Sequence, residues 1–239
     1  MVAAVLYTPI LESIGTDIVS GKLASGSFLT LESIQSRFGV SRTVARECMR
    51  ILESKRLVAS RRRTGIMVQP RDVWNAFDKQ VIRWRLDSDD RPNQLRSLTE
   101  LRLGVEPFAA NLAASRSTEE EQDNLRQAAG EMRVFGEAGR LDRYLAADIE
   151  FHRIVLRSSH NEMYAALVEP VIEAVLERPL QGHTHAYPVP TSIDLHEAVM
   201  VSICNGDSEA AEREMLHLLS DVRAGISEAW DREQEGRVG

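Results

Sequence analysis

Residues 30–58 read TLESIQSRFGVSRTVARECMRILESKRLV, and this stretch decides the fold of the first part of the chain. Thr30 and Ser41 are residue types that cap helices, and Gly39 between them is the type that ends one. The apolar residues that recur at helical spacing are Leu31, Ile34, Phe38, Val44, Cys48, Ile51 and Leu52. The stretch therefore predicts two short helices joined by residues 38–41, which is the pattern of a helix-turn-helix.

The segments on either side complete a small domain. An earlier helix is predicted by an apolar stripe, and the chain leaves this helix at Ser20-Gly21. The stripe consists of Ile10, Leu11, Ile14, Ile18 and Val19. After the two helices, residues 57–60 and 66–68 read as short strands on either side of the basic tip 61–65. A helix-turn-helix followed by such a hairpin predicts a winged helix-turn-helix, which we place in residues 1–71.

Three arginines, Arg42, Arg46 and Arg50, follow one another at intervals of four in the third predicted helix, and Thr43 adjoins them. This spacing puts the guanidinium groups on one face, where they can reach phosphates or guanine edges in the major groove of DNA. The hairpin tip adds Arg62, Arg63, Thr64 and Gly65. The alternative, a merely solvated helix face, leaves the basic hairpin unexplained. We therefore predict that these residues contact double-stranded operator DNA.

The charge of the chain is unevenly spread. The 239 residues carry a net charge of −7, which as an average argues against a polyanion-binding protein. Residues 1–70, however, hold ten basic and five acidic residues, whereas the remainder holds 19 basic and 31 acidic residues. This asymmetry predicts two domains with different partners. The hydrophobic fraction of 43% excludes general disorder, and the aromatic fraction of only 5% favours helices over a β-sandwich or barrel.

Several classes of protein are excluded by what the sequence lacks. No stretch approaches the roughly 20 apolar residues of a membrane helix, and the N-terminal segment does not read as a signal peptide. Cys48 and Cys204 are far apart and outside any metal-binding or redox motif, as expected for free thiols in the cytoplasm. Glycine-rich nucleotide-binding motifs are absent. We expect a cytoplasmic protein that is not a nucleotide-dependent enzyme.

Beyond Pro70 the helical periodicity predicts a mainly α protein. Residues 72–92 read as a linking helix and loop, 93–232 as an all-helical antiparallel bundle, and 233–239 as a C-terminal tail. The helices are predicted at 93–115, 118–137, 140–158, 161–180, 191–204 and 207–230. Pro107 and Pro170 fall inside predicted helices and are expected to kink them.

A possible metal site lies in the bundle. Asp148 and His152 are four residues apart and share one helix face. His196 and His217 lie nine residues before and eleven residues after the helix break at Asn205-Gly206, so the two are at similar heights on antiparallel helices. One carboxylate and three imidazoles are a suitable ligand set for zinc, nickel or manganese. The alternative is that these histidines are structural.

The other histidines are weaker candidates. His160 lies two turns beyond His152, near the expected end of its helix, and His183 and His185 fall in a loop. Asn161 and Ser192 are expected to add hydrogen bonds to the hydroxyl groups of a ligand.

Arg102 is the candidate for binding a small acid. It stands in an otherwise apolar stretch of the first bundle helix, and a buried arginine requires a partner. The partner is either a structural carboxylate, with Glu106 at i+4 the nearest, or the carboxylate of a bound effector. We favour the effector.

Residues 10–70 resemble the DNA-binding domain of GntR-type bacterial transcription regulators. The resemblance is carried by residues 18–23, Gly26, residues 38–47, residues 52–58 and Gly65. It implies that the residues matching Arg42 and Arg46 contact the operator and that the wing glycine enters the minor groove. One departure is the run 30–33, where the family usually has an arginine that touches DNA; here Glu32 and its neighbours supply no basic contact. The operator is therefore expected to differ from the family's common one.

Residues 93–225 resemble the helical effector domain of the FadR-type branch of that family. The matching stretches are 100–107, 112–114, 148–152, 159–161, His196, 206–207, 210–211 and His217. The resemblance implies that Asp148, His152, His196 and His217 bind a divalent metal, most often zinc, and that Arg102 binds the carboxylate of the effector. Residues 70–75, with Trp84 and Leu86, are similar to regulators of sugar-acid catabolism.

These features together predict a homodimeric, metabolite-responsive repressor that binds two half-sites of operator DNA and responds to a small carboxylic acid, with a sugar acid as the expected class. Two alternatives stay open at this point. One is a metal-dependent enzyme that acts on a small hydroxy acid. The other is a regulator whose metal only stabilises the fold.

Overall fold

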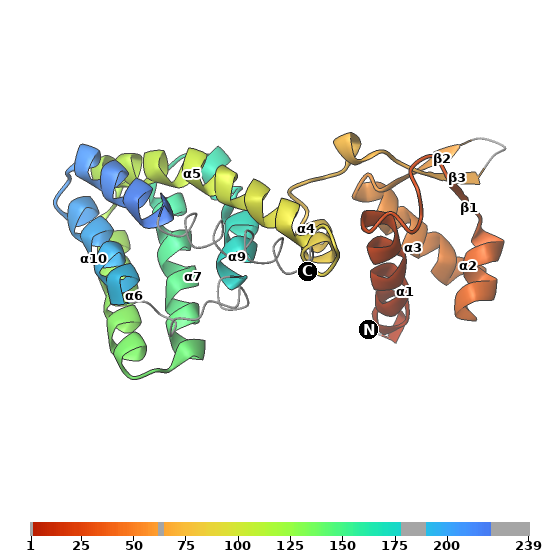
Figure 1. The fold of residues 1–239 in the computed structure, drawn as a ribbon, viewed down its shortest axis with the longest axis horizontal. Helices are drawn as coiled ribbons and strands as arrows, with labels where there is room; N and C mark the ends of the chain where they lie inside the picture. The colour runs from red at the N-terminus through yellow and green to blue at the C-terminus, as the bar shows by residue number, and fades with distance from the viewer. Residues whose placement is uncertain (1, 62–64, 178–189, 221–239) are drawn as a thin grey trace, which may run out of the picture. The chain divides into compact units, whose positions relative to one another are not determined.

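The computed structural model describes residues 2–61, 65–177 and 190–220. Within it the chain forms two compact units, Met1–Gln94 and Leu95–Gly239. The predicted contacts of Arg62, Arg63 and Thr64 lie outside the described residues, as do His183, His185 and residues 221–239. The predicted class is confirmed: a small winged helix-turn-helix unit and an all-helical unit (Figure 1).

The first unit combines helices with a small antiparallel sheet. Its elements are α1 Val2–Val19, β1 Phe28–Leu29, α2 Leu31–Phe38, α3 Arg42–Ser54, β2 Val58–Arg61, β3 Gly65–Val68, the 3₁₀ turn η1 Arg71–Val73 and α4 Lys79–Leu86. The strands are ordered β1-β3-β2, with Leu29 opposite Ile66 and Arg61 opposite Gly65. The strand β1 was not predicted, because two residues are too short to show an alternating pattern.

The helix-turn-helix begins and ends where the sequence predicts. The Thr30 hydroxyl accepts a hydrogen bond from the Ser33 amide at 3.0 Å and caps α2, and Gly39 ends that helix with φ 65°. The Ser41 hydroxyl accepts from the Val44 amide at 3.3 Å and caps α3. The buried residues of α3 are Ala45, Cys48, Met49 and Leu52, whereas Val44 and Ile51, which were predicted to face inward, are only half-buried.

The predicted linking helix is part of the first unit's core. Trp84 of α4 is buried, and its indole N–H donates to the carboxylate of Glu12 on α1. Gly15 of α1 lies directly under the indole, because a Cβ built there would come within 2.6 Å of the Trp84 ring. Lys55 at the end of α3 forms an ion pair with Asp78, the cap of α4, at 2.8 Å. The segment is therefore fixed to α1 and α3.

The second unit is a bundle of helices. They are α5 Arg91–Arg116, α6 Glu119–Glu137, α7 Leu141–Ser158, α8 Glu162–Ala165, α9 Val168–Leu176, α10 Pro190–Cys204 and a last described helix over residues 208–220. Four predicted helices agree with the structure to within two residues. The helix predicted at 161–180 is instead two helices, α8 and α9.

The two prolines differ in their surroundings. Pro107 lies inside α5, as predicted. Pro170 is the third residue of α9 and therefore belongs to its first turn, where a backbone N–H has no partner within the helix. The expected kink at Pro170 is wrong for this reason.

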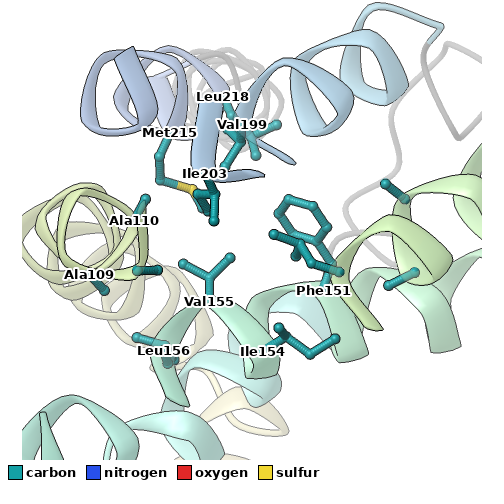
Figure 2. Packing of buried hydrophobic residues seen from close by; sticks show 14 of the residues in the cluster. Ala109, Ala110, Phe151, Ile154, Val155, Leu156, Val199, Ile203, Met215 and Leu218 are labelled. Atoms are coloured by element: carbon teal, nitrogen blue, oxygen red, sulfur yellow. The ribbon is translucent and has the colours of Figure 1, made fainter. Parts of the chain in front are cut away.

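The core of the bundle is mainly aliphatic, as the composition predicts, and α7 packs one face against it (Figure 2). Phe151 and Val155 of α7 are fully buried, together with Val199 and Ile203 of α10. Ala109 and Ala110 contribute small, fully buried side chains to this core from α5. None of the helices in the described ranges is long and apolar enough to cross a membrane.

Candidate metal centre and DNA-contacting face

Three of the four predicted metal ligands meet in the interior of the bundle. Asp148 and His152 share one face of α7, and His196 comes from α10. All three side chains are fully buried. The Oδ1 of Asp148 lies 3.3 Å from Nε2 of His152 and 3.2 Å from Nε2 of His196, and the three candidate ligand atoms lie within 4.8 Å of one another.

The hydrogen bonds of the two imidazoles decide which nitrogen faces the cluster. His196 donates from Nδ1 to the backbone carbonyl of Ser192 at 2.6 Å, and Nδ1 of His152 hydrogen-bonds to Oε2 of Glu106. With N–H at Nδ1, each ring presents the lone pair of Nε2 toward Asp148. The two Nε2 atoms and a carboxylate oxygen thus face one another in a buried site. The donor set fits a divalent metal.

His217, the predicted fourth ligand, lies apart from this cluster in the structure. It lies on the last described helix, where its side chain is exposed. The residues of that helix that face the core are Ala211, Met215, Leu218 and Leu219, and Figure 2 draws Met215 and Leu218 in the packed interior. This buried stripe puts His217 on the opposite side of the helix. A similar height along two antiparallel helices therefore does not bring two side chains together, because each side chain must also lie on the helix face that points toward the other helix.

His160 is likewise outside the cluster. Its side chain is half exposed, and its Nε2 lies 3.0 Å from Oε2 of Glu121, which belongs to the N-terminal cap of α6. His160 therefore contributes to the surface of the bundle and not to the buried site.

Arg102 is buried beside the metal ligands. Its Nε donates to Oε1 of Glu106 at 2.5 Å, and its Nη2 lies 3.1 Å from Nε2 of His152. Burial raises the pKa of Glu106, but the charge of Arg102 and the hydrogen bonds from His152 and Arg102 outweigh this effect and lower the pKa to about 2. Glu106 is thus ionised, and it is the structural carboxylate that the sequence suggested as a partner of Arg102 in place of a bound effector. The guanidinium nevertheless lies at the edge of the metal cluster, where a ligand carboxylate could also reach it.

Sequence reasoning missed how two residues support the site. Glu106 was considered only as a partner of Arg102, yet it also orients His152. Ser192 was predicted to use its side chain on a ligand, whereas the structure shows its backbone carbonyl orienting His196 one turn later. Asn161, the other predicted effector contact, accepts from the Met163 amide at 3.0 Å and caps α8. The contact between Ser192 and His196 could have been predicted from the sequence, because residues four apart are neighbours on a helix.

In the first unit, Arg42, Thr43, Arg46 and Arg50 are all exposed on α3. The three arginines border an open groove of about 590 Å³ that is also lined by residues at the start of α2 and of strand β3. Two acidic side chains meet these arginines. Arg42 Nη2 lies 3.7 Å from Glu32 Oε1, and Arg50 donates to both carboxylate oxygens of Glu47 at 3.0 and 2.7 Å.

Gly65 is required by the sheet itself. Its φ is 105°, and a Cβ there would lie 2.9 Å from the carbonyl oxygen of Leu29 on the neighbouring strand β1. The glycine therefore permits β1 and β3 to pair next to the hairpin tip, whatever contact the tip makes with DNA.

Comparisons with known proteins cover both units. The model of the bacterial regulatory proteins of the gntR family matches residues 6–68, and that of the FCD domain matches residues 97–221. The chain is 33% identical to the galactonate operon transcriptional repressor of Escherichia coli, over 92% of this chain and 96% of that protein. It is 27% identical to the putative L-lactate dehydrogenase operon regulatory protein of the same species, over 84% and 78%.

Solved structures share the fold. One described by its role in controlling the agr system of Listeria monocytogenes superimposes with a TM-score of 0.62 at 17% identity, over 95% of this chain and 97% of that one. A GntR protein from Streptococcus agalactiae gives a TM-score of 0.51 at 20% identity, over 87% and 99%.

Proposed function

The chain belongs to the GntR family of bacterial transcription regulators and carries an FCD domain, and from this premise we propose that it is a repressor tuned by a 2-hydroxy acid. The matched families and the named relatives are transcription regulators, so the protein is a metabolite-responsive DNA-binding regulator and not an enzyme. We propose, in addition, the identity of the effector, the identity of the metal and the oligomeric state.

The observation that carries the proposal is the position of Arg102. Its Nη2 lies 3.1 Å from Nε2 of His152, and that nitrogen faces the Asp148 carboxylate. A guanidinium beside a group of metal ligands is suited to a small carboxylate, which can accept hydrogen bonds from the arginine and also approach the metal. When bound, the metal would be held by Asp148, His152 and His196 and would supply a positive centre for the oxygens of the acid.

The class of acid follows from chemistry and from the relatives. Galactonate and lactate, which appear in the names of the two relatives, both carry a hydroxyl group beside the carboxylate. This shared group favours a 2-hydroxy acid, and among these we propose a sugar acid, because the more similar relative regulates the galactonate operon. We propose zinc as the metal, because two imidazoles and one carboxylate are ligands that zinc commonly accepts.

The DNA side of the proposal rests on α3. Arg42, Thr43, Arg46 and Arg50 would enter the major groove, with the hairpin residues Arg62, Arg63, Thr64 and Gly65 on the adjacent backbone or minor groove. Two copies of the chain would bind two half-sites as a homodimer. Effector binding would change the fraction of the protein that is competent to bind DNA.

The test is a thermal-shift and gel-shift titration of the full chain. Galactonate, gluconate and lactate are added to zinc-loaded protein and to chelator-treated protein. We expect galactonate to raise the melting temperature only when zinc is present, because a ligand specific for the native state stabilises it by mass action. The same acid should change the amount of operator DNA retained. Arg102→Lys should weaken the shift, whereas Arg153→Lys, a control at a partly buried arginine of α7 that pairs with the exposed Glu150, should not.

Failure would take a recognisable form. If chelation lowers the melting temperature and no acid alters either readout, the metal is purely structural. If the acids act equally well without metal, the proposed role of the metal centre is wrong while the regulator assignment stands.

A further inference from the structure

We infer that Glu32 reads a cytosine in the operator, accepting a hydrogen bond from the N4 amino group while Arg42 binds a neighbouring guanine. The inference rests on the proposed placement of α3 in the major groove, and it adds a base contact from a different helix, α2. It also gives the acidic residue at the start of α2 a function of its own.

The position of Glu32 is set by the local fold. It is the second residue of α2, whose start is fixed by a reciprocal capping box between Thr30 and Ser33. The carboxylate therefore stands at the N-terminal end of the helix, where the helix dipole favours negative charge. Its side chain is 69% exposed, and that of Arg42 is 64% exposed.

Glu32 and the predicted reading residues line the same groove. Oε1 of Glu32 lies 3.7 Å from Nη2 of Arg42, and Arg46 and Arg50 border the groove as well. The first turns of α2 and α3 thus present a carboxylate and a guanidinium side by side. A duplex that places base edges against Arg42 would therefore lie beside Glu32 as well.

The chemistry of DNA restricts what a carboxylate can contact there. Phosphates repel it, so the backbone is excluded as its partner. In the major groove only the amino groups of cytosine and adenine donate hydrogen bonds. The adenine amino group lies between two acceptors that repel a carboxylate, its own N7 and O4 of the paired thymine, whereas the cytosine amino group has an acceptor on one side only, O6 of the paired guanine. The guanidinium of Arg42 in turn matches the O6 and N7 acceptors of guanine. The pair therefore fits a G·C-containing step.

A matched control is available on α3. Glu47 carries the same charge in the same domain, but both of its carboxylate oxygens already accept hydrogen bonds from Arg50. Removing the charge of Glu47 changes the electrostatics of the domain without removing the proposed base contact.

The experiment selects preferred half-sites from a random DNA library with wild-type protein, Glu32→Gln, Glu32→Ala and Glu47→Gln. We expect the wild type to favour cytosine at one position by about tenfold, the size of a direct base contact. Glu32→Ala should lose the preference at that position alone. Glu32→Gln should shift it toward adenine, because an amide pairs with adenine on two atoms. Glu47→Gln should keep the cytosine.

A chemical probe separates direct contact from indirect effects. N4-methylcytosine at the selected position replaces the amino hydrogen that points into the groove, so it should weaken binding of the wild type by a similar factor and leave Glu32→Ala unaffected. If N4-methylcytosine is tolerated by the wild type, or if Glu32→Ala selects the same site, the inference is overturned. Arg46→Ala tests the proposed placement of α3 in the major groove. If this variant binds operator DNA normally, the proposed role of α3 is wrong. If Arg46→Ala loses DNA binding but the Glu32 variants keep the wild-type base preference, only the cytosine contact is overturned.

Discussion

Glu106 of α5 and His152 of α7 are hydrogen-bonded in the fully buried interior of the bundle, between Oε2 of the carboxylate and Nδ1 of the ring. The same carboxylate accepts from Nε of Arg102 through its other oxygen. Glu106 thus joins the arginine proposed to hold the effector to a histidine proposed to hold the metal. Partners of this kind fix the tautomer and the orientation of a ligand ring.

Replacing Glu106 with Gln should therefore weaken metal binding without removing a ligand. We expect the affinity for zinc to fall by about 10- to 100-fold, the usual effect of losing a partner behind a metal-binding histidine. The measurement is a competition titration against a chromogenic chelator, with the fold checked by circular dichroism. Glu150→Gln, an exposed position on α7, is the control and should leave the affinity unchanged. Equal affinities for both variants would mean that Glu106 does not orient His152.

His217→Ala should bind zinc as tightly as the wild type, because the side chain is exposed on the far side of its helix. His196→Ala should lose the tight site, because its Nε2 lies 3.2 Å from Asp148 Oδ1 within the cluster. Metal content after gel filtration distinguishes the two variants. Loss of zinc from His217→Ala would show that the last helix turns its other face to the site when metal binds.

Gly15→Ala should destabilise the first unit by about 1–3 kcal/mol, the usual effect of overpacking a core. The added methyl group would meet the Trp84 ring at 2.6 Å and push α4 away from α1. Thermal unfolding followed by tryptophan fluorescence gives the change. The control is Gly130→Ala on α6, where the space around the Cβ is open and alanine is expected to stabilise the helix by up to about 1 kcal/mol. A neutral Gly15→Ala would show that α4 is not seated on α1 as described.

Gly65→Ala should lower the stability of the hairpin and the affinity for operator DNA together. The new side chain would combine a strained φ of 105° with a 2.9 Å approach to the Leu29 carbonyl, and such strained positions cost about 1–3 kcal/mol. Gly39→Ala, with φ 65° and open space, bears the backbone strain without the collision and should be milder. Gel shifts and melting curves of the two variants test whether Gly65→Ala has the larger effect. A larger loss of stability and DNA affinity in Gly39→Ala would contradict the prediction.

Much of the fold was readable from local patterns. The caps at Thr30 and Ser41, the stop at Gly39 and the boundaries of α6 and α7 are set by hydrogen bonds and apolar periodicity within a few residues of sequence. Short or locally ambiguous features were missed: β1 is defined by its partner β3, and the break between α8 and α9 carries no glycine.

The sequence by itself determined that this is a winged helix-turn-helix followed by a helical bundle, and that Asp148 and His152 share a face, because the 3.6-residue period fixes neighbours four residues apart. It did not determine that His196 belongs to the cluster while His217 does not, or that Glu106 supports His152 from 46 residues away. Those relationships depend on which face each helix turns toward the others. Packing of residues such as Leu218 decides that face, and packing is a property of the assembled core and not of any one segment.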